Sequence, residues 1–345
     1  MQLSMPLHYA GDPKTTVDKI ADLEKAGLGG VWIAEAYGFD AATMMGYVAA
    51  KTERVTIGSG ILQIYTRTPT LMAQTAAGLD YLSGGRAILG LGASGPQVIE
   101  GWHGVPYHKP LARTREIIDI CRTVWKREEK LTHDGIYQIP LPPEKGTGLG
   151  KPLKIINHPV RDRIPIYAAS LGEKNVELTA EIADGWIPIF FMPERFREVW
   201  GAALDAGKAK RSPELGELQI SAGGMLAIGE GEDTKKLLDF VRPNVALYVG
   251  GMGARDKNFY NTLARRYGYE KEAALIQDLY LDGKKDEAAA AVPQELIEHT
   301  NLVGPESWVR ERVLALRDAG VTHLNVTPVG GDAVAMIEKV KSWIS

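Results

Sequence analysis

Residues 55–69, VTIGSGILQIYTRTP, are the stretch whose residue types and spacing most directly suggest chemistry. An apolar strand is interrupted at Gly58 and Gly60 and resumes at residues 61–63 before a polar turn. Glycines inside a strand mark a bulge or a close approach of the backbone to a ligand. An ordinary barrel strand that runs into a loop has the same pattern, so this stretch alone leaves both interpretations open.

A second glycine-rich run, GLGASG at residues 90–95, has the letters of a dinucleotide-binding fingerprint. That fingerprint requires an immediate helix, then a second strand with an acidic residue about 20 residues further on. Residues 96–110 are instead rich in Gly, Pro and His, and a helix follows them. We therefore expect a glycine-rich strand end whose amides contact a flat ring or a ribityl chain, and not a Rossmann domain.

Residues 169–172, Ala-Ser-Leu-Gly, precede a predicted helix that carries Lys174 and Asn175. The hydroxyl of Ser170, the free amides of a helix N-terminus and the positive end of the helix dipole all favour an anion. This segment is a candidate phosphate site. A plain serine N-cap followed by a turn glycine would look the same.

Few residues have the chemistry of an acid or base at a predicted strand end. Glu35 follows Trp-Ile-Ala and could hydrogen-bond a cofactor ring, transfer a proton or pair with a cation. His8 ends the first predicted strand and could be a pocket or a core histidine. Other histidines lie in loops without ligand spacing, so we expect no metal site. The sequence contains neither a nucleophile elbow nor a P-loop.

Eight apolar segments alternate with helical patterns along the chain. Strands are predicted at about residues 2–8, 30–34, 55–60, 86–91, 164–168, 184–187, 218–226 and 321–326. Two stretches depart from the alternation, namely a Pro- and Gly-rich loop excursion at about 133–159 and a helical insert at about 235–299. Strand–helix alternation implies a parallel sheet, and eight units without a second composition regime favour one α/β domain, a TIM-like (β/α)8 barrel over residues 1–345. Chemistry in such a barrel lies at the C-terminal ends of the strands.

Bulk composition narrows the class of partner. The 345 residues are 45% hydrophobic and 24% charged with a net charge of -3, so we expect no nucleic-acid partner. The single cysteine, Cys121, lies in a helical pattern, which predicts a small buried side chain and a reducing compartment. The chain has no apolar run of about 18 residues and no signal pattern, so we expect a cytoplasmic protein without a membrane partner.

Several segments together resemble the luciferase-like superfamily of flavin- and deazaflavin-dependent oxidoreductases. They are WIAE, IGSGILQIYTRTP, RAILGLGASG, PIYAASLGEKNVELTAEIADGW and GPESWVRERVLALRDAGVTHLNV, and the resemblance covers nearly the whole chain. It is closest to the coenzyme F420 branch, which includes methylenetetrahydromethanopterin reductase and F420-dependent glucose-6-phosphate dehydrogenase. The resemblance implies a bacterial luciferase-like barrel that binds coenzyme F420, or FMN, at its C-terminal face. We expect a small-molecule substrate and a homodimer or higher homo-oligomer.

The resemblance also assigns site residues. Glu35 stands where the family usually has an aspartate near the deazaflavin ring, and Gly60-Ile61 where relatives carry a non-prolyl cis peptide against which the ring packs. Gln63 matches a polar residue that contacts the ring. The remaining matches are contacts to the ring, side chain and ribityl-phosphate region: Ala93, Ser94, Ser170, Leu171, Gly172, Asn175 and Val176.

Two departures from the family bear on the substrate. The sugar-phosphate dehydrogenases have a histidine where this chain has Ala36, and a glutamate where it has Gly95. We therefore do not expect glucose-6-phosphate dehydrogenase activity, and the candidate acids or bases are Glu35, His8 and Tyr65. The predicted function is hydride transfer between coenzyme F420 and a small, partly apolar organic substrate. The alternatives are an FMN-dependent monooxygenase and a non-catalytic flavin-binding barrel.

Overall fold

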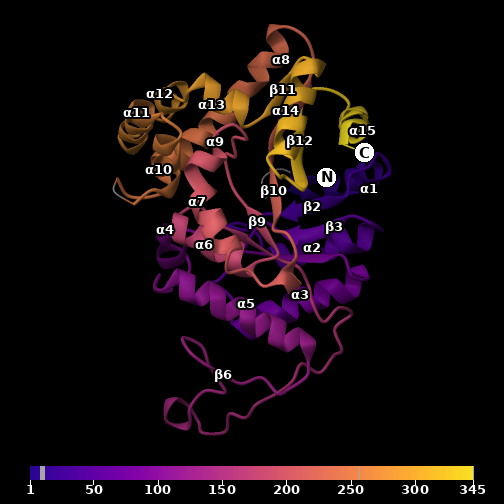
Figure 1. Cartoon of the computed structure of the whole chain (residues 1–345), viewed down its shortest axis with the longest axis vertical. Coiled ribbons are helices and arrows are strands. Elements are labelled where there is room, and N and C mark those ends of the chain that lie inside the picture. The colour runs from indigo at the N-terminus through magenta and orange to yellow at the C-terminus, as the bar shows by residue number, and fades with distance from the viewer. Residues whose placement is uncertain (8–11, 256, 345) are drawn as a thin grey trace.

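A closed barrel of parallel strands forms the centre of the molecule (Figure 1). The computed structural model describes residues 1–7, 12–255 and 257–344. Within them the barrel strands are β1 (Gln2–Leu7), β2 (Gly30–Ile33), β3 (Thr56–Ser59), β5 (Ala87–Gly92), β8 (Ile166–Ala169), β9 (Gly185–Ile187), β10 (Gln219–Ile228) and β12 (His323–Pro328). Neighbours around the barrel follow chain order, and β12 closes it by pairing with β1. The predicted TIM-like barrel is confirmed, and each predicted strand overlaps an observed one.

Helices follow the strands and cover the outside of the barrel. They are α1 (Pro13–Lys25), α2 (Ala41–Lys51), α3 (Pro69–Ser83), α5 (Pro110–Lys126), α6 (Glu173–Ile182), α7 (Phe196–Lys208), α14 (Glu306–Asp318) and α15 (Ala333–Ile344). Local sequence explains the ends of α3: the Thr68 hydroxyl accepts from the Leu71 amide, Pro69 opens the first turn, and Gly84 ends the helix at φ 67°. Cys121 is buried on α5, as predicted. No helix among the described residues is both long and apolar enough to cross a membrane.

Four short elements were not predicted. A helix, α4 (Pro96–Gly101), follows β5 directly, and β11 (Leu302–Gly304) pairs with β10. The strand β4 (Leu62–Gln63), by contrast, lies where the strand was predicted to resume after Gly60, and it pairs with β5. The excursion contains a small hairpin of β6 (His133–Asp134) and β7 (Gln138–Ile139). Segments of two to six residues are too short to show a hydrophobic period, so their pairing depends on the neighbouring strands.

The segment between β10 and β11, where a helical insert was expected, is largely helical. It contains α8 (Glu232–Lys236), α9 (Arg242–Ala246), α10 (Phe259–Arg266), α11 (Glu270–Leu281), α12 (Lys285–Ala290) and α13 (Gln294–His299). Figure 1 shows α9 to α13 gathered at the upper left, above α4, α6 and α7. The insert therefore lies on the side of the barrel where the β5 and β8 segments end.

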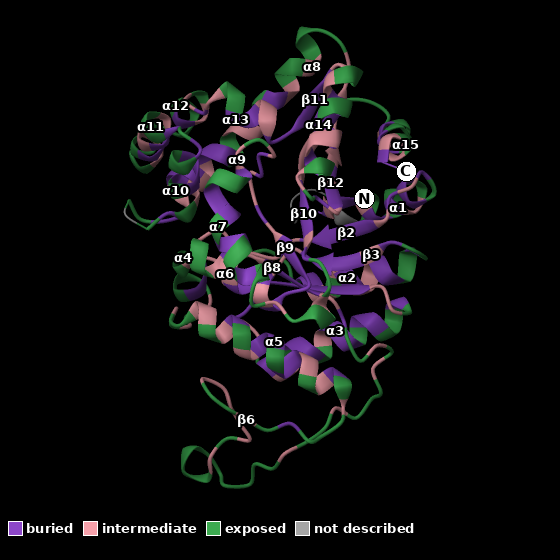
Figure 2. Cartoon of the chain, in the orientation of Figure 1, coloured by how far each residue is buried: buried purple, intermediate pink, exposed green. Residues whose placement is uncertain are grey.

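A group of polar side chains and a group of aromatic rings occupy the barrel interior. Ser4 donates to the Asn325 carboxamide oxygen, and the Asn325 amide donates to Ser221. The rings of Trp32, Tyr167 and His323 pack against one another, and the ring centres of Trp32 and Tyr167 lie 5.3 Å apart. The strands β2 and β5 are buried along their whole length, and Figure 2 shows β2 and β3 largely buried. These partners fill the barrel, so it is a packed core and not a channel.

We expect His323 to make the protein less stable in mild acid. Burial, with a smaller effect of the N-terminal amine, lowers the pKa of His323 from 6.5 to about 4. The unfolded chain therefore binds a proton at His323 more tightly than the folded protein does. The stability that depends on neutral His323 is present above pH 6.5 and is lost as the pH falls towards 4. The slope is at most about 1.4 kcal/mol per pH unit. Urea unfolding at several pH values should show this slope, and His323→Asn should remove it; equal slopes in both proteins would contradict the assignment.

Candidate functional site

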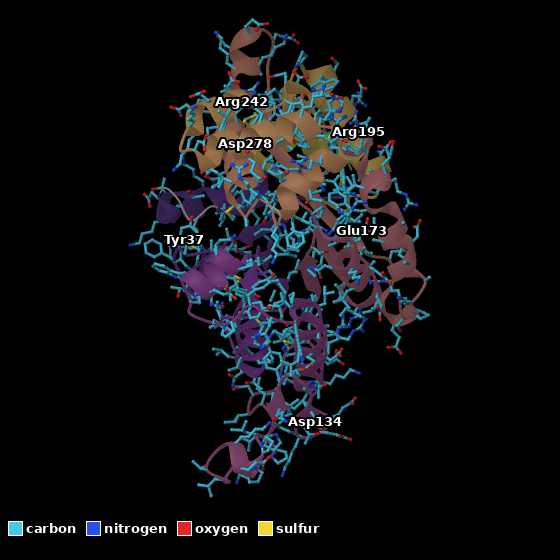
Figure 3. All side chains as sticks on the ribbon, turned by 90° about the vertical axis from the view of Figure 1, so that its left-hand side faces the viewer. Tyr37, Asp134, Glu173, Arg195, Arg242 and Asp278 are labelled. Carbon is cyan, nitrogen blue, oxygen red and sulfur yellow. The ribbon has the colours of Figure 1, made fainter. Side chains whose placement is uncertain are left out.

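The predicted site residues lie together along one arc of the barrel. They follow the C-terminal ends of β2, β3, β5 and β8, which are consecutive neighbours in the sheet. In Figure 3, Tyr37, which follows β2, and Glu173, which follows β8, both lie below the insert, at a similar height along the vertical axis. The topology therefore brings the residues predicted from separate segments to one end of the barrel.

The peptide bond between Gly60 and Ile61 is cis, as predicted. The Gly60 N–H donates to the Ile33 carbonyl oxygen at 2.7 Å, which fastens the bulge to β2. Apart from its own chain neighbours, a Cβ atom on Gly60 would meet only the Trp32 Cβ among the described residues, at 3.3 Å. The space beside this peptide is therefore uncrowded, as a surface for a flat ring requires.

The glycines of β5 make room for the bulge. A Cβ atom on Gly90 would lie 1.7 Å from the Ser59 carbonyl oxygen, and one on Gly92 would lie 2.3 Å from Ile61 Cδ1. The Ser59 hydroxyl also donates to the Gly90 carbonyl oxygen at 2.8 Å and accepts from the Gly90 N–H at 2.9 Å. Strand packing therefore explains two glycines of the run GLGASG, Gly90 and Gly92. The sequence does not reveal this role because Ser59 and Gly90 are 31 residues apart.

Gln63 carries a buried acceptor for which the described part of the chain supplies no hydrogen-bond donor. Its amide nitrogen donates to the Ala36 carbonyl oxygen at 3.1 Å. Its carboxamide oxygen is buried and has no hydrogen-bond donor among the described residues. Buried polar atoms are nearly always paired, so this oxygen is suited to accept a hydrogen bond from a bound molecule. Gln63 follows the cis peptide by two residues, and the two features fit a ring that carries N–H groups.

Ala93 and Ser94 are half-buried at the end of β5. Ser94 has a left-handed conformation at φ 57°, and its carbonyl oxygen accepts from the Tyr107 hydroxyl at 3.3 Å. This turn carries the chain from β5 into α4 beside the bulge. Their predicted contact with the cofactor stays a prediction.

The segment after β8 differs from the prediction in its details. The Ser170 hydroxyl is buried and lies 2.9 Å from the Thr179 hydroxyl, so it is already used inside the fold. The Val176 side chain is fully buried, and the Asn175 and Val176 amides both donate to the Gly172 carbonyl oxygen at 2.9 Å. Helix α6 begins at Glu173 without a side-chain cap. An anion here would therefore contact the first amides of α6 and not the Ser170 hydroxyl.

Leu171 holds this segment through its backbone. Its carbonyl oxygen accepts from the Trp200 indole at 2.8 Å, and the Ser170 carbonyl oxygen accepts from the Trp186 indole at 3.0 Å. Two buried tryptophans therefore set the path of the chain from β8 into α6. This arrangement positions the α6 N-terminus at the same end of the barrel as the cis peptide.

Glu35 is held by an arginine that the sequence left without a role. Arg67 donates to both Glu35 carboxylate oxygens, at 2.7 and 2.9 Å, and also contacts Asp40 at 2.5 Å. Glu35 also accepts from the Ala41 amide at the start of α2. The hydrogen bonds to Glu35 raise the pKa of Arg67 above its ordinary value. Of the three roles open to Glu35, the structure favours pairing with a cation.

The signal for this pair was present in the sequence. Glu35 ends one strand, and Arg67 follows the end of the next segment in the barrel. Because neighbouring parallel strands end side by side, opposite charges at these two ends are expected to meet.

Tyr65 holds a loop in this structure. Its side chain is buried, and its hydroxyl donates to the His108 carbonyl oxygen at 3.0 Å. Burial raises the pKa of the Tyr65 phenol above its ordinary value. The Tyr107 ring lies 5.0 Å away and the Arg113 guanidinium lies over its face. These contacts direct the Tyr65 phenol at the α4–α5 connection, so its predicted acid–base role has no geometric support. The other candidate, His8, lies outside the described residues.

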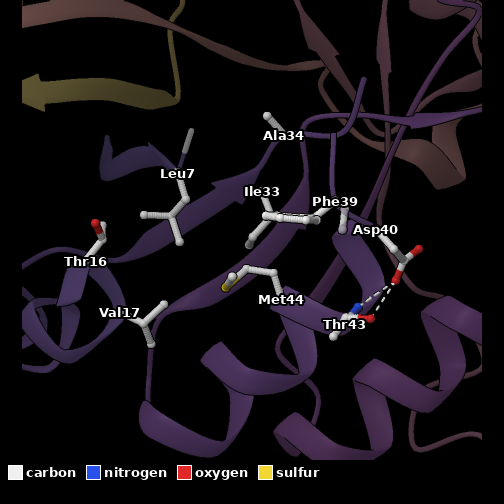
Figure 4. A pocket seen from close by; sticks show the side chains of 10 residues that line it. Leu7, Thr16, Val17, Ile33, Ala34, Phe39, Asp40, Thr43 and Met44 are labelled. Carbon is white, nitrogen blue, oxygen red and sulfur yellow. Dashed lines mark hydrogen bonds between the residues drawn. The ribbon is translucent and has the colours of Figure 1, made fainter. Parts of the chain in front are cut away.

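A cavity of about 340 Å³ lies beside this end of the barrel (Figure 4). It is enclosed between α1, α2 and the ends of β1 and β2, and apolar side chains such as Val17, Ile33 and Met44 line it. Asp40 lies at its margin and accepts from the Thr43 amide and hydroxyl. The lining includes neither the cis peptide nor Gln63, so this cavity is separate from the candidate cofactor site.

Comparisons with known proteins agree with this geometry. The sequence model for the luciferase-like monooxygenases matches residues 1–323. The chain is 44% identical to a Mycobacterium tuberculosis protein provisionally named a coenzyme F420-dependent oxidoreductase, over 97% of each chain. It is 28% identical to 5,10-methylenetetrahydromethanopterin reductase of Archaeoglobus fulgidus, over 92% of this chain and 90% of that one.

A solved structure shows the same fold. The F420-dependent tetrahydromethanopterin reductase of Methanopyrus kandleri superposes with a TM-score of 0.75 and 23% identity, over 98% of this chain and 96% of that one. The family resemblance stated from the sequence is thereby confirmed. The chain belongs to the luciferase-like monooxygenase family, in which it groups with the oxidoreductases named for coenzyme F420.

Proposed function

We propose that this chain is a coenzyme F420-dependent oxidoreductase that transfers a hydride between the deazaflavin and a small, partly apolar organic substrate. The observation that carries the proposal is the buried Gln63 oxygen, which has no hydrogen-bond donor among the described residues and lies two residues after the cis peptide at Gly60-Ile61. The names of the relatives support the choice of coenzyme F420 over other flat cofactors.

Each part of the site has a distinct task under this proposal. Coenzyme F420, when bound, supplies the hydride chemistry at its deazaflavin ring. The Gly60-Ile61 peptide supports the ring, and the Gln63 oxygen accepts a hydrogen bond from a ring N–H. The first amides of α6 hold the phosphate. Arg67 and Glu35 position the turn that carries the Ala36 carbonyl oxygen, which in turn orients the Gln63 amide.

Aromatic side chains near the barrel end support a partly apolar substrate. Tyr37 and Trp102 are both exposed, and their ring centres lie 6.5 Å apart. Phe259, at the start of α10, is also exposed, and its ring would lie 3.4 Å from a Cβ atom on Gly172. Such rings bind flat or apolar groups well. None of the three carries a charge that would select a sugar phosphate.

Binding titrations test the cofactor. We expect the purified apoprotein to bind coenzyme F420, followed by fluorescence or calorimetry, more tightly than FMN. We expect Gln63→Leu to weaken F420 binding by about 10- to 100-fold, because the ring N–H then faces no acceptor. Gln219→Leu, at the opposite end of the barrel, serves as the matched control and should bind normally.

Three outcomes would count against the proposal. Tight FMN binding without F420 binding would favour the FMN-dependent monooxygenase. F420 binding without turnover across a broad panel of alcohols, aldehydes and enones would favour the non-catalytic barrel. An unchanged affinity in Gln63→Leu would remove that side chain from the cofactor site.

A further inference from the structure

The helical insert brings Tyr260 to the end of the barrel. Tyr260 lies in the first turn of α10, which Figure 1 shows above α4 and α6. The ring of the adjacent Phe259 would lie 3.4 Å from a Cβ atom on Gly172, the residue before α6. On the other side, Tyr107 is near enough to influence the ionisation of Tyr260, and its hydroxyl donates to the Ser94 carbonyl oxygen after β5. Because β5 and β8 pair with each other, Tyr260 lies over the arc of the barrel that carries the candidate cofactor site.

A buried asparagine fixes the position of Tyr260. Asn258 is 3% exposed, and its side-chain oxygen accepts from the Tyr260 and Asn261 amides at 2.9 and 3.0 Å. Its side-chain nitrogen donates to the carbonyl oxygens of Tyr248 and Val249 at 2.9 and 3.0 Å. The start of α10 is thereby tied to the segment that carries Tyr248. A side chain held in this way is suited to orient a bound molecule.

Uncharged rings adjoin the Tyr260 side chain. The ring centres of Tyr248 and Tyr260 lie 4.7 Å apart, and those of Tyr248 and Phe190 lie 5.9 Å apart. Phe190 follows β9 and has a left-handed conformation at φ 51°. This conformation is uncommon for a bulky residue, and residues that adopt it cluster at functional sites. The rings extend from the end of β9 towards the ends of β5 and β8, and they suit a flat, uncharged molecule.

The Tyr260 side chain is half-buried, and none of the described residues forms a hydrogen bond with its hydroxyl. Other phenols at this end of the barrel donate to backbone carbonyl oxygens, as those of Tyr65, Tyr107 and Tyr267 do. Burial, and then the phenols of Tyr248 and Tyr107, raise the pKa of Tyr260 above its ordinary value. Tyr260 therefore keeps its proton at neutral pH and can donate it to a bound oxygen.

The acids predicted from the sequence leave this task open. The Tyr65 hydroxyl donates to the His108 carbonyl oxygen, and Glu35 is paired with Arg67. Hydride transfer to a carbonyl carbon places negative charge on the oxygen, which a positioned acid removes by protonation. Compared with Tyr65 and Glu35, Tyr260 has the side chain whose proton is not used in a contact among the described residues.

We propose that the Tyr260 hydroxyl donates a hydrogen bond to the oxygen of a flat, uncharged carbonyl substrate and gives that oxygen a proton when a hydride reaches the carbonyl carbon. The role of Tyr260 rests on the proposed function, in which the hydride comes from the reduced deazaflavin. The carbonyl π bond breaks as a C–H bond and an O–H bond form, so the substrate gains two electrons and becomes an alcohol. Oxidation of the cofactor by the same two electrons releases a proton, and the phenol regains its own proton from solvent.

Ligand binding tests this role without turnover. Acetophenone is a flat ketone, and in α-methylstyrene a methylene group replaces its carbonyl oxygen. Ligand-observed NMR titrations of the full-length protein, without added cofactor, should show acetophenone bound about 5- to 10-fold more tightly than α-methylstyrene. Tyr260→Phe should bind the two probes equally. Tyr47→Phe, which changes another half-buried tyrosine on α2, is the matched control and should keep the preference.

Turnover separates a proton donor from a residue that only shapes the site. With reduced coenzyme F420 and a panel of ketones and aldehydes, Tyr260→Phe should lower kcat by about 100-fold or more. Its melting temperature and its affinity for coenzyme F420 should equal those of the wild type. A wild type that does not prefer acetophenone, or a Tyr260→Phe protein that keeps the preference or the kcat, would overturn the role of Tyr260.

Two further outcomes distinguish this role from the proposed function. Weaker F420 binding by Tyr260→Phe would place the phenol against the cofactor, which would overturn the role and leave the proposed function standing. A wild type that does not bind F420 would overturn the proposed function. The acetophenone comparison would then still decide whether Tyr260 binds a carbonyl oxygen, because it is measured without the cofactor.

Discussion

Gly60→Val is expected to bind coenzyme F420 at least about 100-fold more weakly than the wild type, because its methyl groups would overlap the position proposed for the ring. The substituted Cβ would make one tight contact among the described residues beyond the adjoining chain, 3.3 Å from the Trp32 Cβ, which a small shift would relieve. The two methyl groups would extend into the uncrowded region beside the peptide, where the ring is proposed to lie. Fluorescence titration measures the affinity, and Gly46→Ala on α2 is the control for a glycine substitution in open space.

Gly90→Ala should mainly lower the stability of the fold, whereas Gly60→Val should mainly weaken cofactor binding. A Cβ atom there would lie 1.7 Å from a backbone oxygen, that of Ser59, so the strands must shift before the residue fits. We expect Gly90→Ala to lower the thermal stability strongly, whereas Gly60→Val should cost about 1 kcal/mol or less of folding free energy. If Gly60→Val binds F420 normally, or if it unfolds as readily as Gly90→Ala, the bulge is not the surface for the ring.

Arg67→Met is expected to destabilise the fold by about 3 kcal/mol, because it leaves a carboxylate without its cation. The Arg67 and Glu35 side chains are 11% and 9% exposed, so solvent replaces the lost contact poorly. Asp40 is half exposed and should lose little. Urea unfolding should show the loss, and the melting temperature should fall by roughly 4 °C. Coenzyme affinity should also fall, because the Ala36–Gln63 hydrogen bond lies beside this pair.

Double substitution separates a paired charge from a general packing defect. Glu35→Met/Arg67→Met removes both charges, so we expect it to be more stable than Arg67→Met alone. Arg67→Lys keeps the charge but cannot bind both carboxylate oxygens in the same way, so it should recover part of the loss. Equal stability of Arg67→Met and the wild type would show that Glu35 does not depend on this pair. Glu35 would then be open again to the catalytic role expected from the sequence.

The strand ends were predictable because each strand carries its own signal. An apolar run that stops at a glycine or polar residue can be located without knowledge of the fold, and the barrel rule then places all such ends on one face. The position of the cis peptide came from the family resemblance, and the structure confirms it. The contact partners of the site residues could not be predicted in this way.

Ser170 and Tyr65 show why side-chain roles were harder to predict. Ser170 has the sequence context of a phosphate ligand, but its hydroxyl forms a hydrogen bond with the Thr179 hydroxyl on α6. Tyr65 lies in the loop after the bulge, but its hydroxyl donates a hydrogen bond to the His108 carbonyl oxygen, 43 residues away. Each of these contacts depends on how a loop returns to the barrel, and the residue types alone do not specify the path of that loop.

The sequence by itself determined the eight strands, the end of the barrel where chemistry occurs, and the family. These properties follow from local hydrophobic periods and from motifs that lie within single segments. Only the tertiary structure decided that Arg67 binds both carboxylate oxygens of Glu35, that Gly90 and Gly92 make room for the bulge, and that the Gln63 oxygen has no hydrogen-bond donor among the described residues. The physical reason is that these contacts join side chains from different strands, whose approach is set by the closure of the barrel.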